Sequence, residues 1–175
     1  MVDPDEGVRI EDYDPRWPER FETLRLRMAV LLSGMVTAIE HVGSTAVPGL
    51  AAKPIIDIDL LLKADRDLPP VVIALTSLGY AHRGDLGITG REAFRPPPND
   101  FPHHLYVCSP DSSAYRQHIA FRDFLRAHRE EADAYASMKR GLAFKYGSDR
   151  EAYTKAKSEF VERILRRAGE NPGKG

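Results

Sequence analysis

The chain has a single cysteine, Cys108, among its 175 residues, and this shortage excludes several kinds of structure. One cysteine cannot form an intrachain disulfide or a multi-cysteine metal site. The first residues are acidic and lack the basic and apolar regions of a secretory signal, so we expect none. The longest apolar stretch, about residues 28–39, is too short and too interrupted to span a bilayer. These absences predict a cytoplasmic chain that has no membrane partner.

The net charge is also close to zero, because the chain has 25 basic and 26 acidic side chains. This balance argues against a protein whose main task is binding nucleic acid or an acidic membrane. The total hides an asymmetry: residues 1–110 carry 11 basic and 16 acidic side chains, a net of −5, whereas residues 111–175 carry 14 and 10, a net of +4. Either long surface helices simply carry more Lys and Arg, or an acidic, metal-holding half faces a basic half that holds phosphate.

The chain has enough residues and apolar content for one packed domain, with 42% hydrophobic and 29% charged side chains. We expect a single domain over residues 1–175. Its parts are a sheet-containing core in 1–110, a helical portion in 111–170 and a frayed tail in 171–175. Nothing in the sequence indicates an oligomeric state.

Hydrophobic spacing predicts an α/β (α+β) fold in which helices flank a short mixed sheet. A helix opens at Pro18 and buries one face, ending near Gly34, with the apolar positions Phe21, Leu24, Met28 and Leu31. Strands are expected at 37–43, 54–63 and 103–108, a helix at 69–78, and a hairpin in 80–95 with its turn in 84–90. The proline-rich residues 95–102 predict a loop. Three further helices are expected at about 112–127, 129–146 and 148–168.

The strand at 54–63 carries two carboxylates, Asp57 and Asp59, at positions i and i+2. Such residues point to the same face of a strand, about 6–7 Å apart, while the intervening apolar side chains point to the core. Adjacent carboxylates repel one another and need a counter-charge. Mg²⁺ is a natural one, since it is held by carboxylates, water and substrate phosphates. The alternative is that both acids lie on a solvated face or pair with Arg or Lys.

A glycine-serine pair, Gly43-Ser44, is followed by Thr45, and twelve residues separate the pair from Asp57. Glycine lets the backbone approach a phosphate closely, while consecutive N–H groups and hydroxyls supply donors. A Gly-Ser pair followed by Asp-x-Asp resembles the nucleotidyltransferase superfamily that includes polymerase beta. The resemblance implies that Gly43, Ser44 and Thr45 hold nucleotide phosphates, and that Asp57 and Asp59 hold divalent metals.

The resemblance is closer than the superfamily over residues 39–58, IEHVGSTAVPGLAAKPIIDI, which are similar to the signature of the GrpB-like proteins. Similar segments occur elsewhere in the chain: YDPRWP at 13–18, HHL at 103–105 and FRDFLR at 121–126. The family is assigned to the nucleotidyltransferase fold, and its domain is also found fused to dephospho-CoA kinase in some bacteria. The resemblance therefore implies the fold more directly than it implies an activity.

This sequence departs from the pattern of the wider superfamily in one respect. Active enzymes of the superfamily usually carry a third carboxylate on a neighbouring strand. The strand expected at 103–108 holds no acid. Strand alternation places His104 and Tyr106 on the site face, so His104 is our candidate base or ligand, its alternative being a structural role. Asp85 and Asp100, in predicted loops, are further candidates for the missing acid.

Several cations could hold a triphosphate, since Arg and Lys are the usual phosphate partners. Lys53 precedes the strand with the two acids, Arg91 lies in the hairpin, and Arg122 and Arg126 lie four apart on one helix face. The alternative for each is an ordinary surface charge.

Two further groups of side chains suggest other contacts. The aromatic residues Tyr13, Trp17 and Tyr106 could stack on a base, or they could belong to the core. His41 together with His104 would suggest a transition-metal site, but no third ligand accompanies them.

The predicted function is a Mg²⁺- or Mn²⁺-dependent nucleotidyltransferase that moves a nucleoside monophosphate from an NTP to an unknown acceptor. Asp57 and Asp59 would hold the metal, with His104 as base. The alternative is a non-catalytic nucleotide- or CoA-binding module that keeps the phosphate loop. A third candidate is a purely structural partner protein that binds no nucleotide.

Overall fold

The computed structural model describes residues 8–146 and 149–170, which form a five-stranded sheet and its surrounding helices. The strand order is β1-β2-β5-β4-β3. The strands are β1 (Val36–Val42), β2 (Ile56–Leu62), β3 (Ala81–His82), β4 (Arg91–Arg95) and β5 (His103–Cys108). Three neighbouring pairs are antiparallel, whereas β2 and β5 run parallel. The predicted mixed sheet is therefore confirmed.

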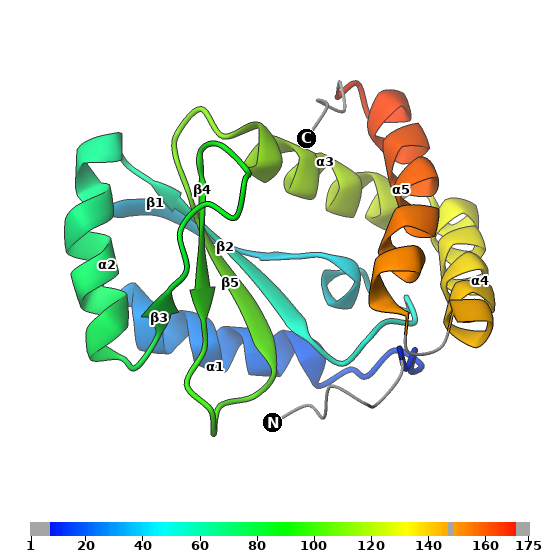
Figure 1. Ribbon diagram of the computed structural model, residues 1–175, viewed down its shortest axis with the longest axis horizontal. Helices are drawn as coiled ribbons and strands as arrows, with labels where there is room; N and C mark the ends of the chain where they lie inside the picture. The colour runs from blue at the N-terminus through cyan, green and yellow to red at the C-terminus, as the bar shows by residue number, and fades with distance from the viewer. Residues whose placement is uncertain (1–7, 147–148, 171–175) are drawn as a thin grey trace.

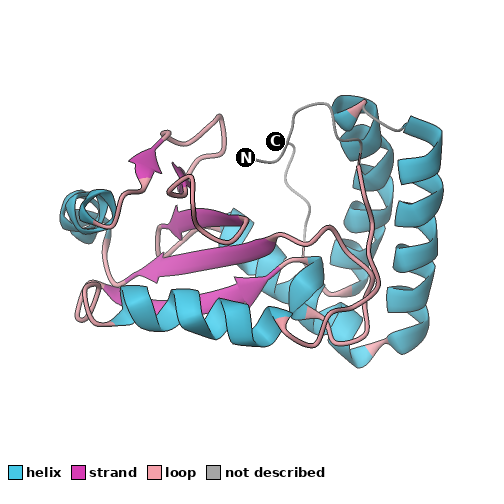
Figure 2. Cartoon of the chain, turned by 90° about the horizontal axis from the view of Figure 1, so that it is seen from below, coloured by secondary structure: helices cyan, strands magenta, loops and turns pink. Residues whose placement is uncertain are grey.

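Two helices, α1 (Trp17–Ala29) and α2 (Leu68–Ser77), cover one face of the sheet. Alternate residues of β2 and β5 point into the core on that face, among them Ile56, Ile58, Leu60, Leu105 and Val107. The opposite face is approached by α3 (Ser113–Ala127). Helices α4 (Arg129–Tyr146) and α5 (Arg150–Arg167) stand side by side beyond the ends of the strands (Figures 1 and 2).

A second core joins α3, α4 and α5 to the connection between β1 and β2. Val47 and Leu50, from that connection, pack against Phe121, Leu125 and Tyr135. The connection begins with a short 3-10 turn, η1 (Ser44–Ala46), which contains most of the predicted phosphate loop. This loop is consequently fixed between the sheet and the C-terminal helices.

One predicted boundary is wrong. Helix α1 ends at Ala29, five residues before Gly34, which lies in the turn to β1 with φ +81°. The helical path continues only briefly beyond Ala29, where the Leu32 N–H still donates to the Met28 carbonyl before the chain turns toward β1. Leu32 fills the core, and Leu31 is 41% exposed.

The other predicted elements lie close to the observed ones. The hairpin expected in 80–95 is formed by β3 and β4, and residues 96–102 contain no strand or helix. The tail at 171–175 and the expected helix start at residue 148 fall outside the described residues. Within the described part of the chain, no helix combines the length and the apolar character needed to cross a bilayer.

Candidate functional site

The carboxylates of Asp57 and Asp59 project from β2 on the face opposite the α1/α2 core. The residues between and beside them, Ile56, Ile58 and Leu60, fill that core, as strand alternation requires. The two acids differ in access, because the Asp57 side chain is 30% exposed and that of Asp59 is fully buried. A position on a solvated surface therefore does not explain Asp59.

Asp57 is hydrogen-bonded to His104, which the parallel pairing of β2 and β5 places directly beside it. The imidazole Nδ1 lies 2.7 Å from Asp57 Oδ1. This hydrogen bond raises the pKa of His104. With Nδ1–H donating to Asp57, Nε2 is the ring atom left to accept a proton when the imidazole is neutral.

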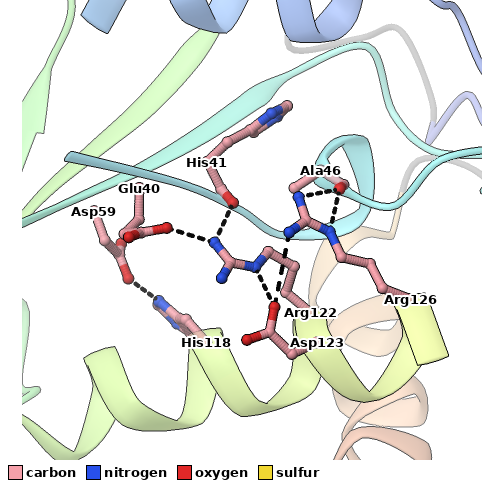
Figure 3. Close-up of polar contacts among 8 residues, drawn as sticks. All are labelled: Glu40, His41, Ala46, Asp59, His118, Arg122, Asp123 and Arg126. Carbon is pink, nitrogen blue, oxygen red and sulfur yellow. Dashed lines mark hydrogen bonds and ion pairs between the residues drawn. The ribbon is translucent and has the colours of Figure 1, made fainter. Parts of the chain in front are cut away.

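Asp59 is hydrogen-bonded to a second histidine, His118 of α3, whose Nδ1 lies 2.7 Å from Asp59 Oδ2 (Figure 3). The other oxygen, Asp59 Oδ1, is buried and has no hydrogen-bond partner among the described residues. A buried carboxylate oxygen ordinarily has a donor or a cation beside it. Asp59 Oδ1 is thus an unpaired buried oxygen, the kind of atom that a bound cation would satisfy.

A third carboxylate lies on the same face, on β1 rather than on β5. Glu40 pairs in register with Asp59, so the two side chains are neighbours across the antiparallel strands (Figure 3). Its Oε2 accepts a hydrogen bond of 2.6 Å from Arg122 Nη1. Glu40 therefore lies on the same face of the sheet as Asp59, and its carboxylate is paired with Arg122.

Arg122 does not line a cavity beside the predicted phosphate loop. It is buried and donates to Glu40, to Asp123 and, over 3.0 Å, to the backbone carbonyl of His41 (Figure 3). Arg126 donates twice to the Ala46 carbonyl, at 2.7 and 2.9 Å. These two arginines join α3 to β1 and to η1, so their placement corrects the expectation that they hold phosphate.

The Gly-Ser turn is pressed directly against Asp57. Gly43 has φ +71°, and a Cβ atom built on it would lie 2.2 Å from Asp57 Oδ2. The close approach of backbone to carboxylate therefore requires glycine here.

The two hydroxyl residues after Gly43 both line one of the cavities beside Asp57, but their hydroxyls have different partners. Ser44 Oγ accepts a hydrogen bond of 2.9 Å from Lys139 Nζ, and Ser44 lines the cavities beside Asp57. The Thr45 hydroxyl is buried, where it contacts the His41 ring at 2.9 Å and donates to the Ile55 carbonyl. Ser44 is thus placed toward a ligand, whereas the Thr45 hydroxyl has a structural role.

Two cavities border Asp57 on either side and share Ser44, Thr154 and Lys157 in their walls. One, of about 420 Å³, is cationic and also contains Lys53, Lys139, His104, Tyr106 and Tyr153. The other, of about 400 Å³, lies between α3 and α5 and is lined partly by apolar side chains, among them Phe121, Val161 and Leu165. We name them the lysine cavity and the α3/α5 cavity.

The remaining predicted cations divide between the site and its surroundings. Lys53 lies in the wall of the lysine cavity, with its ammonium 4.8 Å from the centre of the Tyr153 ring. Arg91 stacks over Tyr106 at 4.2 Å and is in the wall of neither cavity. Its contact in this region is therefore with the Tyr106 ring.

The two loop acids are engaged by partners outside the site. Asp100 pairs with Arg27 of α1, and Asp85 accepts the Gly87 N–H within its own turn. Neither Asp85 nor Asp100 therefore supplies the third carboxylate that active enzymes of the wider superfamily usually carry.

His41 and the N-terminal aromatic residues belong to the core. The His41 ring stacks on Phe21 at 4.8 Å, and burial lowers its pKa to about 4. Its carbonyl points to Arg122 while its ring points away from Asp59 (Figure 3). The hypothesis of a metal site shared by His41 and His104 is therefore wrong. Tyr13 and Trp17 pack edge-to-face at 5.4 Å, with Trp17 buried.

Sequence reasoning missed His118, Lys139 and Lys157. A signal existed for Lys139, because it continues the buried stripe of Ala132 and Tyr135 at helical spacing and so interrupts an apolar face with a charge. His118 lies one turn before Arg122 on α3, but only the tertiary fold brings it to Asp59.

The donors on this face fit a hard divalent cation. Asp57 and Asp59 supply carboxylate oxygens, the ligands that Mg²⁺ prefers, and Asp59 Oδ1 has no other partner in the described chain. As the side chains stand in residues 8–146 and 149–170, no group of three or more His, Cys, Asp or Glu converges on one point. Water and substrate oxygens would have to complete the coordination.

The chain resembles known proteins over most of its length. The family model described as GrpB protein matches residues 7–167. A UPF0157 protein of Pseudomonas aeruginosa is 45% identical over 170 residues, covering 94% of this chain and 69% of the relative. A dephospho-CoA kinase of Mycolicibacterium paratuberculosis is 25% identical, covering 92% of this chain and 46% of the kinase.

Solved structures give the same result for the fold. The conserved protein GrpB from Enterococcus faecalis has a TM-score of 0.82 at 31% identity, covering 91% of this chain and 96% of that one. Cid1 in complex with its short product ApU has a TM-score of 0.50 at 16% identity, covering 74% and 40%. The second likeness concerns the fold alone, and it confirms the predicted nucleotidyltransferase-like architecture.

Proposed function

The chain belongs to the GrpB family, and from that premise and the site geometry we propose a divalent-metal-dependent nucleotidyltransferase. It would transfer a nucleoside monophosphate from an NTP to an acceptor hydroxyl or phosphate. The observation that carries the proposal is the position of Asp57. This acid lies between a glycine-serine turn and a lysine-lined cavity, two residues before a buried acid with an unpaired oxygen.

The lysine cavity suits the triphosphate. Ser44 offers a hydroxyl in its wall, and Lys53 and Lys157 bring cations to the same wall. Burial lowers the pKa of Lys157, and the Asp57 carboxylate opposes that effect. Cationic donors around a concave wall are the usual partners of phosphate oxygens. The α3/α5 cavity, on the other side of Asp57, leaves room for the remainder of the nucleotide or for the acceptor.

Asp57 and Asp59 are the residues that would hold Mg²⁺ or Mn²⁺. A bound divalent ion would neutralise charge on the phosphate oxygens during transfer. Asp59 offers Oδ1 directly, whereas its Oδ2 is occupied by His118. His118 thus orients the buried carboxylate.

His104 would accept the proton of an acceptor hydroxyl. Its Nδ1 is held by Asp57, so Nε2 is the atom that takes the proton. The acceptor oxygen then forms its bond to the α-phosphorus. The bond between the α-phosphorus and the bridging oxygen breaks, and pyrophosphate leaves with the electron pair.

The test is release of pyrophosphate from labelled NTPs with Mg²⁺ across several acceptor classes, including small alcohols, phosphate esters, tRNA and proteins. Asp57→Asn and Asp59→Asn should abolish metal-dependent NTP binding and transfer while leaving the fold intact. Asp85→Asn, in a turn away from the site, serves as the matched control. If both site variants bind NTP and Mg²⁺ as the unmodified protein does, the proposal fails.

A second candidate is a non-catalytic nucleotide- or CoA-binding module. Two observations favour it: β5 contributes no carboxylate to the site face, and Glu40 is engaged by Arg122. Such a module would bind nucleotide or CoA at the same cavities without releasing pyrophosphate. Release stimulated by any acceptor would exclude it.

A further inference from the structure

Lys139 is a buried cation beneath the Gly-Ser turn. Its side chain extends from α4 and is 3% exposed. Nζ donates to Ser44 Oγ at 2.9 Å and to the Ala51 carbonyl at 2.6 Å, and it lies 4.5 Å from the centre of the Tyr135 ring. In the part of the chain that the structure describes, no carboxylate forms an ion pair with it. Buried charges are normally paired, so this arrangement is unusual for a purely structural lysine.

The charges around Lys139 are mostly of its own sign. Burial has the largest effect and, together with Lys157, Arg140 and Lys53, lowers the pKa of Lys139 to about 7, against the weaker influence of Asp57. The neighbouring phenols do not supply a negative charge near neutral pH, because burial raises the pKa of Tyr153 to about 12 and raises that of Tyr135 as well. At neutral pH the ammonium is therefore only partly populated.

Lys139 also lies in the wall of the lysine cavity, beside the hydroxyl that it holds. An anion that enters this cavity and contacts Ser44 meets a lysine without a counter-charge. We propose that Lys139 and Ser44 form an anion subsite in which a bound phosphate group supplies the counter-charge of Lys139 and binding takes up a proton. The identification of the anion as a phosphate group rests on the proposed function, whereas the subsite itself rests on the contacts of Lys139.

Proton linkage sets the direction of the pH dependence. A bound anion stabilises the ammonium, so the pKa of Lys139 is higher in the complex than in the free protein. Between these two pKa values, affinity falls by up to about tenfold for each unit of rising pH. Around neutral pH the free lysine is partly neutral, so binding takes up a fraction of a proton per site.

The experiment is calorimetric titration of the full chain with pyrophosphate, without metal, from pH 6.5 to 9. Two buffers that differ in protonation enthalpy give the number of protons taken up. Sulfate is the second probe, because it does not change its own protonation in this range. We expect affinity to fall above pH 7 and proton uptake to accompany binding.

Three variants test whether Lys139 causes the pH dependence of affinity and the proton uptake. Lys139→Met should bind each anion at least tenfold more weakly and remove the proton uptake seen with sulfate. Lys139→Arg keeps its charge throughout and should make sulfate affinity depend less on pH than it does in the unmodified protein. Lys145→Met, which removes an exposed lysine from the same helix, should behave like the unmodified protein. Thermal unfolding establishes that each variant is folded.

Three results would overturn the subsite: no anion binding by the unmodified protein, binding that is independent of pH, or equal proton uptake in Lys139→Met. Proton-linked binding of pyrophosphate without any nucleotidyl transfer would leave the subsite in place and contradict the enzymatic proposal. The two proposals therefore fail on different measurements.

Discussion

Asp59 has both carboxylate oxygens in the interior of the protein, and only Oδ2 has a hydrogen-bond partner in the described chain. The partner, His118, comes from α3 and is the contact that makes this burial tolerable. Removing one partner of a buried ionic contact leaves a desolvated charge, which costs more than the contact itself contributes.

His118→Leu should lower the free energy of unfolding by about 2 kcal/mol, because Asp59 then loses its hydrogen bond while it stays buried. The double variant Asp59→Asn/His118→Leu should recover at least half of that loss, since the buried charge is gone. Urea denaturation of the four proteins in the cycle measures both quantities. Equal losses in the single His118 variant and the double variant would contradict this account.

Gly43→Ala tests the close approach of the turn to Asp57. The new Cβ atom would meet Asp57 Oδ2 at 2.2 Å, and φ is +71°. Gly34→Ala is the matched control, because φ there is +81° and no heavy atom lies within 4 Å of the added carbon. The control should lose about 1 kcal/mol from backbone strain alone. Gly43→Ala should lose more and also weaken NTP binding, whereas equal losses would mean that Asp57 moves aside freely.

Among the elements, α3 is the one that closes the site face. Arg122 joins it to Glu40 and to the His41 carbonyl, and Arg126 joins it to the Ala46 carbonyl. Sheet, 3-10 turn and helix are thereby connected through arginines rather than through apolar contacts alone.

Arg122→Ala should lower the free energy of unfolding by about 2 kcal/mol, because it leaves Glu40 and a backbone carbonyl without their donor. Arg166→Ala, which breaks an exposed pair with Glu162, should change it by less than about 0.5 kcal/mol. Chemical denaturation compares the two. A loss of phosphate affinity in Arg122→Ala without a loss of stability would restore the original expectation that Arg122 binds phosphate.

Most strands and helices could be predicted from the sequence because each is encoded locally. Spacing and composition predict the strand that carries Asp57 and Asp59, the Gly-Ser turn, and the helices after residue 112. Pairing between distant elements could not be predicted in this way. Strand alternation places His104 on the site face, but its register beside Asp57 depends on the parallel pairing of β5 with β2, which local spacing does not encode. Local spacing likewise does not encode that α3 brings His118 to Asp59 or that α4 brings Lys139 to Ser44.

For the whole molecule, the charge asymmetry of the sequence has a partial structural counterpart. Lys139 and Lys157, from the basic C-terminal part, lie in the same cavity wall as Asp57. Many other basic residues of that part form exposed helix pairs, such as Arg129 with Asp133. Both interpretations of the asymmetry therefore apply, each to different residues.

Acid stability should depend on His41. Burial lowers its pKa to about 4 from an ordinary 6.5, so between these pH values the unfolded chain binds a proton that the folded chain does not. Stability should fall as pH falls through this window, by about 3 kcal/mol in total from this residue.

His41→Gln should flatten that dependence, whereas His128→Gln, which replaces an exposed histidine, should leave it unchanged. Urea midpoints measured from pH 4 to pH 7.5 compare the three proteins. An equally steep loss in His41→Gln would assign the acid sensitivity to other groups.

The contacts that make up the site join residues far apart in the chain. His104 follows Asp57 by 47 positions, His118 follows Asp59 by 59, and Lys139 follows Ser44 by 95. Contacts with such separations form late, because a long loop must close before they are made. On the ribosome, the two aspartates of the growing chain would emerge well before the histidines that bind them. The Gly-Ser turn would lack its contact with Lys139 until α4 is released. Nascent chains halted before α4 should therefore lack the contact between Lys139 and Ser44 even where the sheet has already formed.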